Sequence, residues 1–277
     1  RLMSKLKVFC FGFGQVAESF INKLIYEKKD FDLSITSRQD THQIEINNLK
    51  IISYQFNNDK FDSSIIKKLE EANYILVSIP PIDGKDIVAN YIETNLKKIT
   101  NCKWITYLSA TSVYGDHKGE WVNEKSTTKP TSPNGLSRLE AENIWKSLSL
   151  KNNYPLQIFR LAGIYSNEFN ILKKLQTGKA QLVDKKNHFF SRIHVEDIAN
   201  ILFSSLNNFK NNEIYNICDD KPASQNEVAV YGAKLLKMKQ PALVKLENIE
   251  NEMLKNFYKD SKKVDNKKMK AFFKYNL

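Results

Sequence analysis

Residues 6–17 read LKVFCFGFGQVA, an apolar run that ends in the pattern Gly-x-Gly-x-x-Ala. The apolar run is typical of a buried strand, and the spacing of apolar residues after Gln15 is typical of a helix. In such a strand–turn–helix unit, Gly12 permits the tight turn and Gly14 lets a phosphate approach the backbone. The N–H groups at the start of the helix, at Gln15 and Val16, then face the phosphate. The pattern predicts a dinucleotide-binding turn; the alternative is a glycine turn that only reverses the chain.

Outward from this turn, the N-terminal half alternates strand-like runs with helical segments. We expect strands at residues 6–11, 33–36, 50–54, 74–79 and 104–109, and helices at 15–26, 63–71, 86–99 and 133–150. Beyond them, the sequence predicts strands at 155–160 and 213–217, and helices at 168–177, 195–207, 224–237 and 247–271. Strand–helix–strand units at this spacing need crossover connections, which produce a parallel sheet with helices on both faces.

The fold class that follows is α/β: a Rossmann-like, doubly wound parallel sheet with a smaller, mostly helical C-terminal lobe. The sheet domain is expected over residues 1–165, completed by about 195–218. The segments 166–194 and 219–277 are expected to form the lobe that binds a substrate.

The end of the second expected strand indicates which dinucleotide binds. A domain that binds NAD usually has Asp or Glu there, which accepts a hydrogen bond from the ribose 2′-hydroxyl. This chain has Ser37 and Arg38 instead, with no acid before Asp40. A hydroxyl and a guanidinium suit a 2′-phosphate, so NADP is favoured over NAD, which stays open; alternatively, Arg38 is only solvent-exposed. Ile79 and Pro80, at the end of the fourth strand, are expected beside the adenosine.

The 277 residues carry a net charge of +11, from 42 Lys and Arg against 31 Asp and Glu. Such an excess can indicate nucleic acid, but the lysines of the C-terminal tail alternate with apolar residues, as on solvated helix faces. An anionic small molecule is therefore the favoured partner. No apolar run reaches the roughly 18 residues of a membrane helix, and Cys10, Cys102 and Cys218 lack metal-type spacing. We expect a cytoplasmic protein with reduced thiols, no membrane segment and no metal site.

Four further segments occur in order after the glycine turn. They read LSATSVYG at 108–115, RLAGIY at 160–165, RIHVEDIA at 192–199 and IYNI at 214–217. Together with the turn, this set resembles the NAD-dependent epimerase/dehydratase family of extended and atypical short-chain dehydrogenases/reductases. The resemblance implies a Rossmann domain that binds NAD(P), with Ala162 among the cofactor-binding residues, and a C-terminal substrate domain. It also implies an enzyme that often acts on a nucleotide-linked sugar, and often a homodimer.

The chain departs from this family at the residues that perform the chemistry. The family uses a Ser or Thr together with Tyr-x-x-x-Lys, in which the tyrosine exchanges a proton with a substrate hydroxyl. Asn134 stands at the tyrosine position, Arg138 at the lysine position and Ala110 at the usual Ser/Thr position. Asn134 cannot titrate, so it cannot be the base. Arg138 can still hold ribose hydroxyls, and Thr111 or Ser109 can replace the missing hydroxyl, which makes these three the candidate catalytic residues.

Other side chains are candidates for a base or for substrate contacts. Tyr114 and Glu124 are alternative bases, although a structural role for the tyrosine and a surface position for Glu124 are the simpler interpretations. His194 is a further candidate, but its place just before a helix favours a structural role. Arg192 suits a substrate phosphate, with a solvated arginine as the alternative. Arg192 and Glu124 are therefore the expected substrate contacts.

These observations leave three hypotheses. The first is an NAD(P)-dependent epimerase/dehydratase or oxidoreductase with an atypical active site, which acts on an anionic, nucleotide-sugar-like molecule. The second is a non-catalytic protein that binds or senses NAD(P), for which Asn134 is no defect. The third is a nucleic-acid-binding protein, which only the charge supports. We rank them in this order.

Overall fold

The computed structural model describes residues 5–96 and 98–277, and its largest sheet confirms the predicted α/β class. The strand order is β13-β9-β7-β6-β1-β2-β4-β3, with β5 paired to β4. The pairs β1–β2, β1–β6, β2–β4 and β6–β7 are parallel, as crossover connections require. The strands are β1 Leu6–Phe11, β2 Phe31–Ser37, β3 His42–Ile46, β4 Leu49–Asn57, β5 Lys60–Phe61, β6 Tyr74–Val77, β7 Trp104–Ala110, β9 Leu156–Leu161 and β13 Glu213–Ile217.

The order of the strands reverses between β1 and β6. From β1 the chain builds outward to β2 and β4, and it then returns to add β6, β7, β9 and β13 on the other side. In open α/β sheets, ligands bind outside the carboxyl ends of the strands at such a reversal. Those ends are Phe11, which precedes Gly12, and Val77, which precedes Ser78. The topology therefore places the glycine turn at the ligand-binding edge of the sheet.

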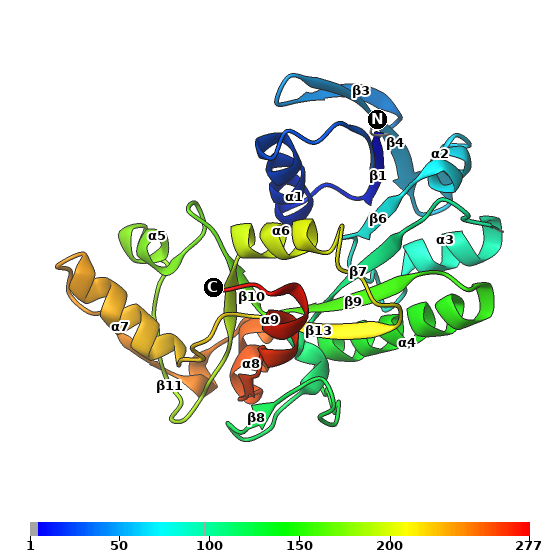
Figure 1. Cartoon of the computed structure of the whole chain (residues 1–277). Helices are drawn as coiled ribbons and strands as arrows, with labels where there is room; N and C mark the ends of the chain where they lie inside the picture. The colour runs from blue at the N-terminus through cyan, green and yellow to red at the C-terminus, as the bar shows by residue number, and fades with distance from the viewer. Residues whose placement is uncertain (1–4, 97) are drawn as a thin grey trace. The chain divides into compact units, whose positions relative to one another are not determined.

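Helices cover both faces of this sheet, with α1 and α6 on one side and α2, α3 and α4 on the other (Figure 1). The face under α2, α3 and α4 is a single apolar core that includes Phe9, Ile75, Val88 and Trp145. Alternate residues of β1, such as Val8 and Cys10, are buried as well, as expected for a strand covered on both faces. The helices are α1 Gln15–Tyr26, α2 Ile65–Glu71, α3 Ile87–Asn95, α4 Pro133–Asn152 and α6 Val195–Ser204.

The chain divides into two compact units. The first consists of Arg1–Ser109, Ser137–Arg160 and Ile198–Tyr215, and the second of Ala110–Leu136, Leu161–Asp197 and Asn216–Leu277. The second unit contains the short parallel pairs β10–β12, β11–β14 and β8–β15. Its elements are η1 Thr111–Tyr114, β8 Trp121–Val122, β10 Gly163–Tyr165, α5 Ile171–Gln176, β11 Leu182–Asp184, β12 Arg192–His194, α7 Gln225–Leu235, β14 Leu243–Lys245, η2 Leu246–Asn248, α8 Glu252–Lys259, β15 Lys263–Val264 and α9 Lys267–Phe273.

The sheet carries a hairpin that the sequence did not predict. Strand β3 pairs antiparallel with β4, where only a single strand at 50–54 is expected. Asn47 and Asn48 between them have positive φ angles of 47° and 68°. Two consecutive residues with positive φ are what a two-residue hairpin turn requires.

The prediction of a single helix at residues 247–271 is wrong. The chain forms α8, then the short strand β15, then α9. Residues Lys263 and Val264 pair with Trp121 and Val122 of β8, and this long-range pairing interrupts the helical pattern. The helix expected at 86–99 is observed as the shorter α3, and residue 97 lies outside the described residues.

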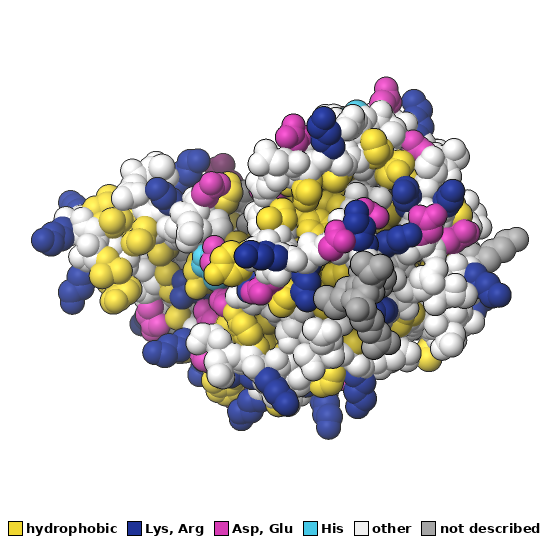
Figure 2. All heavy atoms as spheres, turned by 45° about the horizontal axis from the view of Figure 1, so that its top comes forward, with side chains coloured by type: hydrophobic (Ala, Val, Ile, Leu, Met, Phe, Trp, Pro, Cys, Tyr) yellow, Lys and Arg dark blue, Asp and Glu magenta, His cyan; other side chains and the backbone are white. Residues whose placement is uncertain are grey.

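Three absences hold for the part of the chain that the structure describes. No helix there is both long and apolar enough to cross a bilayer, and no group of His, Cys, Asp and Glu is arranged to hold a metal ion. Cys10, Cys102 and Cys218 are free thiols. On the face drawn in Figure 2, lysine and arginine side chains are spread among acidic ones rather than gathered in one stripe.

Candidate functional site

The glycine turn joins the ends of three neighbouring strands in the first unit. Gly12 has φ +80°, and a Cβ there would lie 3.0 Å from Ile79 Cγ1 and 3.2 Å from Ser78 Oγ. Gly12 N donates a hydrogen bond of 2.8 Å to Thr36 Oγ1, and Ser78 Oγ donates one of 2.9 Å to Phe11 O. Both the positive φ and the close approach of β6 therefore demand glycine.

The start of α1 has the form of a phosphate site. Gly14 is the N-cap residue, and no side chain caps the helix. A Cβ at Gly14 would meet nothing within 4 Å, so the space in front of the helix is open. Gln15 is exposed, while the Val16 side chain is buried against the sheet. The backbone N–H groups at this end attract a pyrophosphate through hydrogen bonds and the helix dipole, so the residues present fit a dinucleotide.

The edge of β2 carries the residues expected near a ribose. Ser37 Oγ is buried and has no hydrogen-bond partner among the described residues. Arg38 is exposed, and within the described part of the chain it forms no ion pair. The nearest acid, Asp40, accepts a hydrogen bond of 3.1 Å from Gln55 Nε2. Ser37 thus has an unpartnered hydroxyl, and the next residue, Arg38, has an exposed guanidinium. These two groups suit the binding of a phosphate or a ribose.

Beside the sheet's carboxyl edge, Ser109 is held in a buried ion-pair network within the first unit. Ser109 Oγ donates a hydrogen bond of 2.6 Å to Glu142 Oε2. Glu142 also accepts two bonds from Arg160, of 3.0 Å from Nε and 2.7 Å from Nη2. All three residues are at most 3% exposed. The hydroxyl of this candidate catalytic residue is thus engaged in the core. No local sequence pattern indicates the Glu142–Arg160 pair.

Arg138 is fixed on the neighbouring strand β7. Its Nη1 donates a hydrogen bond of 2.8 Å to Leu108 O and one of 3.3 Å to Tyr107 OH. Burial raises the pKa of Tyr107, and the guanidinium opposes that rise. Arg138 is half-buried, and two acceptors on β7 set the orientation of its guanidinium.

A cavity of about 290 Å³ lies in the second unit, and its lining residues come from segments that are far apart in the sequence. Thr111, a predicted catalytic residue, lines this cavity. Asn134, which stands at the position of the family's tyrosine, lines it as well. Next to Asn134, a Cβ at Gly135 would lie 2.7 Å from Ser112 O, so the glycine lets the start of α4 pack tightly on η1. The lining also includes Ala110, Ala162, Asp260 and Lys262.

Asp260 and Lys262 are lining residues that sequence reasoning missed. Lys262 is only 9% exposed, and burial lowers its pKa, against the opposing effect of Asp260 and Asp116. Burial raises the pKa of Asp260. Both residues lie in the segment 247–271, for which the sequence predicts one long helix. In that lysine-rich segment no pattern distinguishes these two residues as part of a site.

Glu124 is anchored inside the second unit instead of lying on its surface. Tyr114 OH donates a hydrogen bond of 2.6 Å to Asn216 Oδ1, and Asn216 N donates one of 2.8 Å to Glu124 Oε2. Burial raises the pKa of Glu124. The chain Tyr114–Asn216–Glu124 thus ties η1 and the loop after β8 to the end of β13, and the structural interpretation of Tyr114 fits it.

Arg192 and His194 are the first and last residues of β12. The Arg192 guanidinium lies over the rings of Tyr165 and Phe190, at 5.8 Å and 5.7 Å from their centroids. His194 Nδ1 accepts a hydrogen bond of 3.0 Å from Glu196 N and so caps the start of α6. This cap fits the structural role favoured for His194, whereas the role of Arg192 toward a phosphate stays a prediction.

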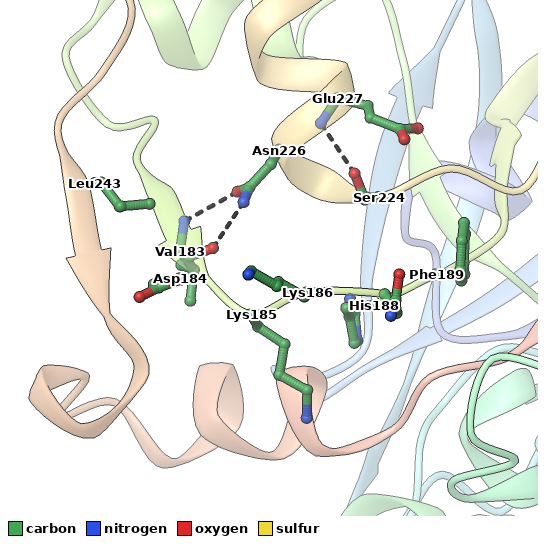
Figure 3. A pocket seen from close by; sticks show the side chains of 11 residues that line it. Val183, Asp184, Lys185, Lys186, His188, Phe189, Ser224, Asn226, Glu227 and Leu243 are labelled. Atoms are coloured by element: carbon green, nitrogen blue, oxygen red, sulfur yellow. Dashed lines mark hydrogen bonds between the residues drawn. The ribbon is translucent and has the colours of Figure 1, made fainter.

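A second cavity, of about 330 Å³, lies elsewhere in the second unit (Figure 3). Asn226 bridges the backbone of Val183 there: Val183 N donates 2.9 Å to Asn226 Oδ1, and Asn226 Nδ2 donates 2.7 Å to Val183 O. Lys185, Lys186 and His188 also line it. The bridge joins β11 to the first turn of α7 and fixes the wall of the cavity.

The parallel sheet and the glycine turn are features of the α/β folds that bind dinucleotides. A sequence model of the NAD dependent epimerase/dehydratase family matches residues 86–218. This match confirms the resemblance expected from the sequence.

Solved structures match nearly the whole chain. A functionally unknown conserved protein from Silicibacter pomeroyi DSS is 29% identical, with a TM-score of 0.83 over 98% of this chain and 93% of that chain. UDP-glucuronic acid 4-epimerase from Bacillus cereus, solved with UDP-glucuronic acid and NAD, is 15% identical, with a TM-score of 0.75 over 98% and 94%. UDP-N-acetylglucosamine 4-epimerase from Methanobrevibacter ruminantium M1 is also 15% identical, with a TM-score of 0.75 over 99% and 93%. The two epimerases show the fold alone. No curated protein matches the chain.

Proposed function

We propose that the chain is an NAD(P)-dependent epimerase/dehydratase-like oxidoreductase that acts on an anionic, nucleotide-sugar-like small molecule. The observation that carries the proposal is the open, uncapped start of α1 behind Gly12 and Gly14, at the strand-order reversal of the sheet. The family match over 86–218 supports the reaction class. The sugar-nucleotide epimerases among the structural neighbours support the substrate class.

In this proposal the cofactor is held by the first unit. Gly12, Gly14 and the N–H groups of Gln15 and Val16 hold the pyrophosphate. Ser37 and Arg38 hold the 2′-phosphate of NADP, because the guanidinium pairs with phosphate and the orphaned hydroxyl gains a partner. When bound, the cofactor supplies a ring that accepts or returns a hydride.

The substrate is held by the cavity of the second unit. Thr111 donates a hydrogen bond to a substrate oxygen, and the Asn134 amide orients a hydroxyl without exchanging its proton. In the first unit, Arg138 keeps its place on β7 through Leu108 and Tyr107 and offers its remaining N–H groups to the ribose hydroxyls of the cofactor.

The first test is a fluorescence titration of NADPH and NADH on the wild type, Arg38→Ala and Lys67→Ala. Lys67 is an exposed lysine on α2 of the same unit, so it controls for the loss of one positive charge. We expect Arg38→Ala to weaken NADPH binding at least tenfold, about 1.4 kcal/mol, with NADH binding unchanged and Lys67→Ala like the wild type. Equal or tighter NADH binding by the wild type contradicts the NADP preference, and binding of neither contradicts the oxidoreductase.

A non-catalytic NAD(P)-binding protein is the second candidate. It is favoured by Asn134 at the tyrosine position and by the Ser109 hydroxyl engaged with buried Glu142. A panel of UDP-glucose, UDP-glucuronic acid and UDP-N-acetylglucosamine with NAD and NADP separates the two. Tight cofactor binding without any change in absorbance at the reduced-nicotinamide band, and without any epimer formed, favours the second candidate.

A further inference from the structure

The cavity of the second unit has no titratable group at the family's usual positions. Asn134 and Ala110 replace the tyrosine and the hydroxyl residue. Among its described lining residues, only Asp260 and Lys262 carry a side chain that gains or loses a proton between about pH 3 and 11. Any side-chain proton transfer inside this cavity therefore falls to that pair.

The backbone around the pair is rigidly attached to the 187–190 segment. Lys262 N donates 3.1 Å to Phe189 O. Ser261 Oγ accepts a hydrogen bond of 2.9 Å from Phe189 N and donates one of 3.0 Å to Asn187 O. His188 Nε2 donates to Asp260 O at 2.6 Å. These bonds fix the main chain that carries Asp260 and Lys262, two residues that line the cavity.

Burial affects the protonation of the Lys262 amine more than the nearby charges do. It has no carboxylate within ion-pair distance among the described residues, although Asp260 and Asp116 act on it from farther away. The positive charges of Lys185 and Lys259 in turn oppose the rise that burial causes in the pKa of Asp260. Burial outweighs the two carboxylates and lowers the pKa of Lys262, so more of the amine is neutral near physiological pH than on an exposed lysine.

We propose that Lys262 is the proton-transferring residue of this cavity and performs the step for which position 134 has no titratable group. The neutral amine takes the proton of a substrate hydroxyl and becomes an ammonium; a bound oxidised nicotinamide would supply the acceptor for the hydride of the adjacent C–H, so that the alcohol would become a carbonyl. In the reverse direction the ammonium returns the proton. Asp260 stabilises the ammonium through its charge. The proposal rests on the proposed function for its substrate and oxidant.

The protonation of Lys262 can be measured without any substrate. Competitive labelling of the native chain with acetic anhydride between pH 6 and 11, read by peptide mass spectrometry, gives a titration midpoint for each lysine. Lys267, whose side chain is 90% exposed, is the reference. We expect the Lys262 midpoint at least one pH unit below that of Lys267, and lower again in Asp260→Asn. A midpoint equal to or above the reference, or no labelling of native Lys262, overturns the proposal.

Three variants then separate proton transfer from simple charge. Lys262→Arg keeps the positive charge but cannot deprotonate, and Lys262→Met removes both, while Lys267→Met is the matched control. With any sugar nucleotide that the wild type converts, we expect both Lys262 variants to lose at least about a hundredfold in kcat, with KM for the arginine variant little changed. Retained kcat in Lys262→Arg overturns the proposal. If the wild type converts no substrate, the proposed function fails, and the labelling midpoint still decides the state of Lys262. Thermal melting confirms that each variant is folded.

Discussion

The glycine turn of the first unit and the cavity of the second are built from different parts of the chain. The turn is a backbone site: Gly12, Gly14 and the first N–H groups of α1 lie within five residues of sequence. The cavity is a side-chain site, whose walls come from η1, the start of α4, the end of β9 and the α8–β15 region. A backbone site is encoded by a local pattern, whereas a side-chain site appears only once distant segments have folded together.

The two sites consequently differ in which substitutions they tolerate. A backbone site is insensitive to the side chains around it but loses its function when a Cβ occupies the space of the ligand. A side-chain site depends on individual groups and on the frame that holds them. The following experiments test this contrast, beginning with the buried ion-pair network of the first unit.

The largest effect is expected for Glu142→Ala in the first unit. The substitution leaves the Arg160 guanidinium buried without its carboxylate and removes the acceptor of Ser109. Removing one partner of a buried ion pair costs about 3–5 kcal/mol, which urea denaturation measures. Glu140→Ala, an exposed residue on the same helix, is the control and should change stability by less than about 0.5 kcal/mol. A loss below about 1 kcal/mol for Glu142→Ala contradicts a structural role of this network.

Gly14→Val tests the backbone site directly. The space at Gly14 is open, so the valine fits the ligand-free protein, but it occupies the place where the pyrophosphate must approach. We expect cofactor affinity to fall at least tenfold, about 1.4 kcal/mol, with the melting temperature changed little.

The matched variant for this test is Gln15→Ala, which removes a neighbouring side chain and keeps the N–H group. Cofactor binding should stay close to that of the wild type, as fluorescence titration would show. If Gln15→Ala weakens binding as much as Gly14→Val does, the site depends on side chains, and the contrast between the two units does not hold.

The same contrast explains what could be read from the sequence. The alternation of apolar runs and helical segments predicted the parallel sheet, because each unit of it is local. The turn at Gly12 and Gly14 was predicted for the same reason. The β3–β4 hairpin was missed because its signal is a pair of asparagines with positive φ, which the sequence carries without the glycine that usually marks such turns.

The cavity was predictable only in part. Thr111 and Asn134 were found through their position in a family motif, and both line it. Asp260 and Lys262 were not found, because the 247–271 segment has a helical pattern that the pairing of β15 with β8 overrides. Ser109 was expected in the site, but its hydroxyl is engaged by Glu142, a residue more than thirty positions away. No local pattern reports such a partner.

The smallest expected effect tests the frame of the cavity through pH. His188 is 1% exposed, and burial lowers its pKa despite the two carbonyls that accept from Nε2. The unfolded chain then takes up a proton near pH 6.5 before the folded chain does, so the stabilisation is complete above that pH and is lost as pH falls through the folded pKa. His188→Gln keeps an N–H donor but does not titrate. Between pH 7 and 5 the free energy of unfolding should therefore fall more in the wild type than in this variant. Equal losses in the two proteins would mean that the protonation of His188 is not linked to folding.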